Sequence, residues 1–167
     1  MNFDFDDEEF ERDVKIKVVG VGGGGGNAVE NMVRNNVEGV DFIIINTDVA
    51  ALKSKDGNTM ERVQIGRKTT KGRGAGGKPP VAAESAKENS DDIAEVLNGA
   101  SLVFVAAGMG GGTGTGAAPV IAQIAKEKGI LTVGVVTKPF DFEREFMMIL
   151  ALHGIAELRK YVDALII

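Results

Sequence analysis

The chain of 167 residues has no cysteine and no tryptophan, and His153 is its single histidine. Without cysteine it can form no disulfide, thiolate nucleophile or zinc–cysteine site. It also lacks an uncharged apolar run of the roughly 18 residues that a membrane-spanning helix needs. Its first residues, MNFDFDDEE, have neither the basic start nor the apolar core of a secretory signal. We therefore expect no direct membrane insertion.

Positive charge is also scarce at the N-terminus. Residues 1–13 hold seven acidic residues against Arg12, whereas the rest of the chain has 18 basic and 17 acidic residues, for a net charge of −5 overall. A body this close to neutral argues against nucleic acid as a partner, because nucleic-acid binding usually needs a basic face. Residues 1–13 are expected to form an acidic flexible tail, with a specific docking segment as the alternative.

Glycine is abundant and clustered. Of the 23 glycines, sixteen fall within residues 20–26, 72–77 and 108–116. Clustered glycine in an otherwise ordinary composition marks places where the backbone must approach something closely.

Hydrophobic patterning predicts strands that alternate with helices from residue 14 onward. Strands are expected at 15–19, 40–45, 62–65, 101–107, 130–136 and 162–167. Helices are expected at 27–36, 50–53, 81–97 with a break near 89–90, 115–128 and 143–160. Asp48 is expected to cap the helix at 50–53. Gly129 is expected to end the helix at 115–128. Alternation of this kind predicts an α/β fold, doubly wound, with a mainly parallel six-stranded sheet and helices on both faces.

The first glycine cluster follows a predicted strand and precedes a helix. It contains G-x-G-x-x-G at Gly20, Gly22 and Gly25. A helix N-terminus in such a position offers free N–H groups to a phosphate. The motif also fits a dinucleotide-binding Rossmann oxidoreductase, for which Asp48 would be the ribose ligand. That alternative remains open on these residues alone.

The second cluster, Gly108-Met109-Gly110-Gly111-Gly112-Thr113-Gly114-Thr115-Gly116, adds a second loop at the same edge of the sheet. Its backbone N–H groups and threonine hydroxyls suit phosphate binding. A second phosphate loop is foreign to the common dinucleotide pattern, and it favours a nucleotide held from two sides.

The third cluster, residues 72–79, nearly matches the P-loop pattern G-x-x-x-x-G-K-[ST]. Pro79 replaces the hydroxyl that would hold Mg²⁺, and the cluster follows a long loop instead of a strand. We interpret it as a loop that closes over the terminal phosphate, with a simple connector as the alternative.

These motifs together resemble the tubulin/FtsZ superfamily, in its bacterial form. The resemblance runs from about residue 15 to 167 and depends on the first glycine loop, Asn46-Thr47-Asp48, Gly74-Ala75-Gly76, the run 111–116 and Thr137-Lys138-Pro139-Phe140. It implies a GTP-binding domain over residues 14–167 that lacks the C-terminal half of the family. The nucleotide-binding residues it implies are Gly23, Gly24, Gly25, Gly26, Asn27, Asn46, Asp48, Gly74, Ala75, Gly76, Gly110, Gly111, Gly112, Thr113, Gly114, Thr115, Pro139 and Glu143.

The resemblance also implies a cytoplasmic cell-division protein that binds GTP or GDP and forms head-to-tail filaments at the division septum. It implies GTP hydrolysis at subunit interfaces and contacts with other division proteins. Whether Mg²⁺ accompanies the nucleotide stays open. No catalytic residue is assigned within the chain, because the family's activating acids lie in the missing half. We therefore expect the chain to be inactive alone.

One helix departs from the family pattern. Met147 stands where the family has an arginine that contacts the nucleotide, and residues 146–152 form an apolar run. A helix that is apolar all round must be buried or self-associate. An interaction module that has lost nucleotide binding is therefore a further alternative.

Overall fold

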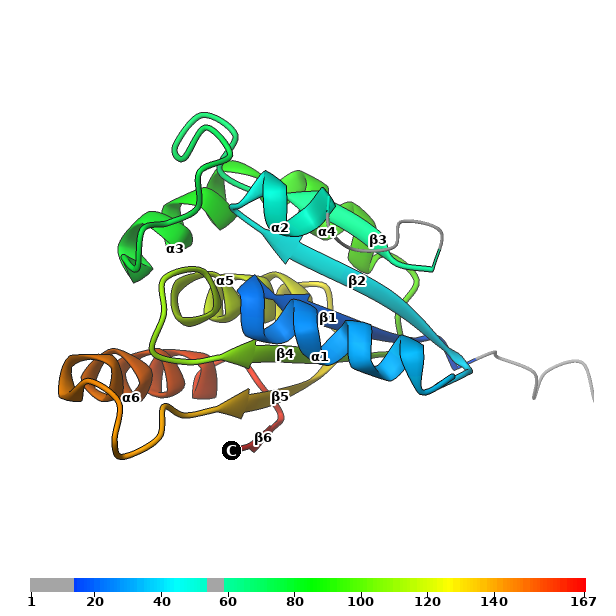
Figure 1. Ribbon diagram of the computed structural model, residues 1–167. Coiled ribbons are helices and arrows are strands. Elements are labelled where there is room, and N and C mark those ends of the chain that lie inside the picture. The colour runs from blue at the N-terminus through cyan, green and yellow to red at the C-terminus, as the bar shows by residue number, and fades with distance from the viewer. Residues whose placement is uncertain (1–13, 54–58) are drawn as a thin grey trace, which may run out of the picture.

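The computed structural model describes residues 14–53 and 59–167 (Figure 1). In this part of the chain six strands form one sheet, in the order β3-β2-β1-β4-β5-β6, and every neighbouring pair is parallel. The strands are β1 Ile16–Val21, β2 Val40–Asn46, β3 Glu61–Gln64, β4 Leu102–Gly108, β5 Leu131–Thr137 and β6 Ala164–Ile166. The prediction of a doubly wound parallel sheet is confirmed.

Helices cover both faces of the sheet because its buried strands carry apolar side chains on both sides. They are α1 Gly22–Arg34, α2 Val49–Lys53, α3 Pro79–Glu88, α4 Ser90–Leu97, α5 Thr113–Glu127 and α6 Glu145–Arg159. One core cluster joins Val18 and Ile44 to Val29 of α1, and Figure 1 shows α1 in front of β1 and β4. The larger cluster lies on the opposite face, where Val19 and Val105 pack with residues of α3 to α6.

The first glycine cluster is more helical than the sequence predicts. We expected a loop up to Gly26, whereas α1 begins at Gly22. A side chain at Gly25 would clash with the carbonyl oxygen of Ala106 in β4, and one at Gly24 would lie 3.2 Å from the Cα of Gly108. The glycines therefore let the first turn of a helix lie directly on a neighbouring strand, a use that helix propensity does not reveal.

Three further helix starts differ from the prediction by two residues. α3 begins at Pro79 and α5 at Thr113, each two residues early, and α6 begins at Glu145, two residues late. Glu143 instead closes a turn, because its backbone N–H donates to the carbonyl oxygen of Phe140 at 2.9 Å. The predicted break between α3 and α4 is confirmed, as is the cap by Asp48, whose Oδ1 accepts from the N–H of Ala50 at 2.8 Å.

The sheet is covered unevenly around β5. On the face of the sheet that α1 covers, Leu131 is 52% exposed and Val135 is 36% exposed.

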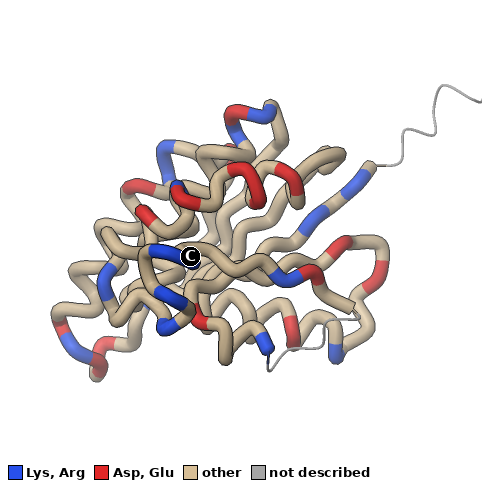
Figure 2. Tube along the Cα trace, turned by 90° about the horizontal axis from the view of Figure 1, so that it is seen from above, with Lys and Arg blue, Asp and Glu red and all other residues tan. Residues whose placement is uncertain are grey.

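Figure 2 shows basic and acidic residues mingled over most of the described trace. The predicted acidic tail, residues 1–13, lies outside the described residues. Among the helices of the described part, none is long and apolar enough to cross a membrane.

Candidate functional site: a glycine cradle at the carboxyl edge

The N-terminus of α1 lies at the carboxyl edge of the sheet with its backbone donors free of side-chain caps. Val21 occupies the cap position and makes no side-chain hydrogen bond, and the first turn holds no acidic residue. Gly23 is exposed, and a methyl group added there would meet no atom within 4 Å. The first four N–H groups of a helix lack intrahelical acceptors and carry the positive end of the helix dipole. This turn can therefore accept an anion.

A second helix N-terminus meets the first. The loop after β4 leads into α5 through Gly112, which makes no side-chain cap, and the first turn of α5 also has no acidic residue. A side chain at Gly22, where φ is +72°, would lie 2.8 Å from the backbone N of Gly114. Two uncapped helix ends thus touch through glycine backbone. We call residues 22–27 and 108–113 the glycine cradle.

Threonines tie the cradle together from within. The Oγ1 atoms of Thr47 and Thr113 lie 2.7 Å apart and share a hydrogen bond. The hydroxyl of Thr115 is buried and accepts from the N–H of Gly110 at 2.9 Å, which fixes the loop after β4. Gly114 lies buried in the first turn of α5. The hydroxyl of Thr113 therefore faces the end of β2, whereas that of Thr115 points into its own loop.

The end of β2 forms the next wall. The side chain of Asn46 is buried, and its Oδ1 accepts from the N–H of Asp48 at 3.1 Å. The carboxylate of Asp48 caps α2, so this side chain has a structural role in the fold. Asn46, Gly23, Gly26 and Asn27 line a hollow of about 100 Å³ between α1, β2 and α2.

The loop before α3 joins the cradle at the second helix end. A side chain at Gly112 would lie 2.9 Å from the backbone N of Lys78 and 3.1 Å from the Cβ of Ala75. The N–H of Gly74 donates to the carbonyl oxygen of Thr47 at 3.3 Å. Gly74 and Gly76 have φ of +81° and +59°, so the loop needs glycine there.

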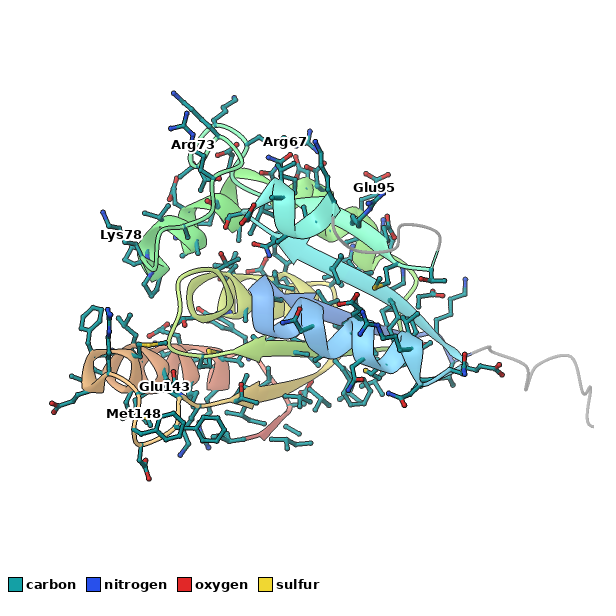
Figure 3. The ribbon with its side chains drawn as sticks, viewed as in Figure 1. Arg67, Arg73, Lys78, Glu95, Glu143 and Met148 are labelled. Carbon is teal, nitrogen blue, oxygen red and sulfur yellow. The ribbon has the colours of Figure 1, made fainter. Side chains whose placement is uncertain are left out.

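The turn after β5 closes the lower side of the edge. Pro139 packs against Gly110, and the Oε1 of Glu143 accepts from the N–H of Phe140 at 3.1 Å. Figure 3 shows Glu143 and Met148 near α6, away from the loop that carries Arg73 and Lys78. The backbone oxygen of Met147 also approaches Gly110.

All the predicted site residues therefore lie at the carboxyl edge of the sheet, on five neighbouring segments. The residue that the prediction left out is Thr47, whose position between Asn46 and Asp48 was the available signal. A larger groove of about 390 Å³ lies elsewhere, between α3, α5 and α6. Backbone donors on an open edge make a phosphate site without a deep hollow, so groove size does not locate it. No three His, Asp or Glu side chains gather as metal ligands in residues 14–53 and 59–167.

This fold and its two facing glycine loops define a class of nucleotide-binding domain distinct from a single-loop Rossmann domain. Residues 15–167 match the family model described as "Tubulin/FtsZ family, GTPase domain". The chain belongs to this family. The expected resemblance is confirmed, and nothing found favours the oxidoreductase alternative.

Curated relatives support the assignment. The chain is 57% identical over 141 residues to "Cell division protein FtsZ" of Buchnera aphidicola from Acyrthosiphon pisum, a match that covers 84% of this chain and 36% of the relative. It is 58% identical over 140 residues to the protein of the same name from Pseudomonas aeruginosa, covering 84% and 35%. The chain thus spans about a third of the length of these relatives.

Solved structures agree with the sequence comparison. The empty FtsZ dimer of M. jannaschii matches with a TM-score of 0.87 and 41% identity, over 91% of this chain and 44% of that one. The GTPγS-bound protofilament of CetZ2 from Haloferax volcanii matches with a TM-score of 0.81 and 27% identity, over 90% and 48%.

Proposed function

We propose that this chain is the nucleotide-binding part of an FtsZ-like cell-division protein that binds GTP and GDP in the glycine cradle. The observation that carries the proposal is the contact between two uncapped helix N-termini through Gly22 and Gly114. Free N–H groups and two helix dipoles that converge on one edge favour a ligand with several adjacent phosphates.

Different residues around the cradle would contact different parts of the nucleotide. Gly23, Gly24, Gly25, Gly26 and Asn27 offer the donors of α1, while Gly110, Gly111, Gly112 and Thr113 offer those that lead into α5. Ala75 lies against Gly112, with Gly74 and Gly76 on either side of it in the chain, and we propose that a terminal phosphate extends toward these three residues. Asn46 and Asp48 form the wall at the end of β2, and Gly114 and Thr115 belong to the first turn of α5. Pro139 and Glu143 flank the side away from α1.

The chemistry that this chain supplies is electrostatic. Phosphoryl transfer needs its reacting groups aligned and its developing negative charge stabilised, and fixed N–H donors do both. Mg²⁺, when it accompanies GTP, supplies further charge neutralisation through the phosphate oxygens. No side chain of the cradle is a general base for water. We therefore propose that the chain binds GTP but does not turn it over alone.

The relatives guide the proposal for the whole protein. Their names give cell division as their role, and the similar solved structures include a dimer and a protofilament. We propose that copies associate head to tail, with the carboxyl edge of one sheet facing the next copy. Hydrolysis would then need groups from the neighbouring subunit. We also propose that the whole protein contacts other division proteins.

A thermal-shift comparison tests the binding proposal. GDP and GTP should raise the melting temperature of the purified chain, and ATP and NAD at equal concentration should raise it much less. Equal shifts with ATP and GTP would refute guanine preference. A larger shift with NAD would restore the oxidoreductase alternative, and no shift with any nucleotide would favour the interaction module.

A phosphate-release assay tests the proposal of inactivity. GTP turnover by the unaltered chain should stay at background over a range of protein concentrations. Turnover that rises with concentration would show that the chain carries its own activating groups.

A further inference from the structure

A basic loop stands beside the cradle, and its charged side chains take no part in the proposed nucleotide contacts. Residues 67–78 contain five cations and no acid, and we call them the basic loop. The cations are Arg67, Lys68, Lys71, Arg73 and Lys78. All five are exposed, and none of them forms an ion pair within the described residues. Figure 3 shows Arg67, Arg73 and Lys78 directed away from the sheet.

The acids near this loop are engaged with backbone groups. The carboxylate of Glu88 accepts from the N–H groups of Lys68 and Thr69 at 2.8 and 3.1 Å, and from the hydroxyl of Thr69 at 2.7 Å. The carboxylate of Asp48, whose backbone pairs with Arg73 in an isolated bridge, caps α2. The ammonium and guanidinium groups of the basic loop are thus directed to solvent.

The same chain carries an acidic segment of nearly equal and opposite charge. Residues 1–13 hold seven acids and Arg12, and Phe3, Phe5 and Phe10 stand among the acids. This segment joins the described part at the amino end of β1, where the carbonyl oxygen of Lys15 accepts from the N–H of Ser101 at 2.8 Å. The basic loop instead follows the carboxyl end of β3. In a parallel sheet these ends lie on opposite edges.

We propose that the acidic segment 1–13 of one copy binds the basic loop 67–78 of the next copy in a head-to-tail pair, an inference that rests on the association proposed above. Stacking the amino edge of one sheet over the carboxyl edge of another brings the two charged segments together. Within one copy, the segment would have to run back along the whole sheet to reach its own loop.

The charge pairing gives the association a direction. Opposite charges face each other only when unlike edges meet, whereas like edges bring acid to acid or base to base. Complementary charges of this kind speed encounter and suppress wrong orientations. Because the cations of the basic loop are exposed, the attraction should weaken as salt shortens the Debye length from about 10 Å at 0.1 M to about 3 Å at 1 M.

A peptide-binding experiment tests the contact directly. The receptor is the full chain with Asp6, Asp7, Glu8 and Glu9 changed to lysine, so that its own segment cannot occupy the loop. A fluorescent peptide of residues 1–13 should bind it at about 0.1 M salt. Binding should fall about tenfold or more when Arg67→Glu and Lys71→Asp are added, since two acids then face the acidic peptide and most of the net positive charge of the loop is lost. Aspartate is chosen at Lys71 because φ there is +52°, which aspartate tolerates.

A matched control separates the loop from net charge. Lys126→Glu with Lys128→Glu makes the same charge change on exposed residues at the end of α5. This receptor should bind the peptide as the parent receptor does. Equal losses from both pairs of changes would overturn the proposal, because net charge alone would explain them. Absence of peptide binding to the parent receptor would also overturn it.

Mixing two variants shows whether the acidic segment binds the basic loop of a neighbouring copy or of its own copy. The full chain with Arg67→Glu and Lys71→Asp, and the full chain with the lysine-substituted segment, should each associate weakly in sedimentation velocity. An equimolar mixture should recover association into mixed pairs, because the unaltered acidic segment of the first variant then finds the unaltered basic loop of the second. Failure to recover would overturn the proposed partner. The substituted residues lie outside the glycine cradle, so GTP binding measured in parallel reports separately on the proposed function.

Discussion

The hydroxyls of Thr47 and Thr113 lie 2.7 Å apart and join the end of β2 to the first turn of α5. This side-chain hydrogen bond links the end of β2 directly to the glycine cradle. It sets where the hydroxyl of Thr113 points, and so it prepares the second helix end for a ligand. Removing it should loosen the cradle without removing any backbone donor.

Thr47→Val should weaken GDP binding and lower the free energy of unfolding by about 1 kcal/mol, because a largely buried hydroxyl loses its partner. Calorimetric titration and chemical denaturation measure the two effects. Thr47→Ser keeps the hydroxyl and should retain most of the affinity. Equal affinity in the valine and serine variants would show that the hydrogen bond does not shape the site.

Gly25 and Gly23 should respond in opposite ways to alanine. At Gly25 the added methyl group clashes with the carbonyl oxygen of Ala106, so Gly25→Ala should destabilise the fold by about 1–3 kcal/mol. At Gly23 the methyl group meets no atom within 4 Å, so the fold should tolerate it while nucleotide binding weakens. Thermal melts and titration with GDP separate the two. Full GDP affinity in Gly23→Ala would place the phosphates elsewhere.

Glu88 should make the start of the basic loop sensitive to acid. Hydrogen bonds from the N–H of Lys68, and next from the hydroxyl of Thr69, hold the pKa of Glu88 below its ordinary value of 4.5. Since the folded-state pKa is depressed, the stabilisation is complete above about pH 4.5 and is lost as the pH falls through the lower folded-state value.

NMR titration of the Lys68 and Thr69 amides checks this effect. Both should shift in one acid step with a midpoint below 4.5, and the step should vanish in Glu88→Gln. Glu84→Gln, on the exposed side of α3, serves as the control and should leave the step in place. A midpoint at or above 4.5 would contradict the hydrogen-bonding interpretation.

The apolar run of α6 should promote association that salt does not weaken. Phe146, Ile149 and Leu152 are 64%, 50% and 54% exposed. Exposed apolar residues at this spacing form a stripe along one side of a helix. Ile149→Lys with Leu152→Lys should therefore reduce association at about 1 M salt, where charge pairing is screened. Glu127→Lys is a polar control, and an equal reduction by it would contradict the prediction.

The architecture could be predicted because segments with strand-like and helix-like hydrophobic patterns alternate along the chain, and because the buried strands are continuous apolar runs. It placed the starts of α1 and α5 late because five consecutive glycines, and a threonine among glycines, have low helix propensity. Tertiary packing decides these starts: the first turn of α1 lies on β4, where only glycine fits.

The same limit applies to the site. Composition marked the glycine loops, but the hydrogen bond between Thr47 and Thr113 joins residues 66 positions apart in the chain. The roles of Asp48 and Thr115 within the fold likewise depend on neighbours that spacing alone does not specify.

Amide chemical shifts of the unaltered chain during titration with GDP test most directly that the two uncapped helix ends hold the nucleotide. The largest changes should fall on the N–H groups of residues 23–27 and 110–113, with little change when NAD is added instead. Changes concentrated along the groove between α3, α5 and α6, with the glycine cradle unaffected, would contradict the proposed site.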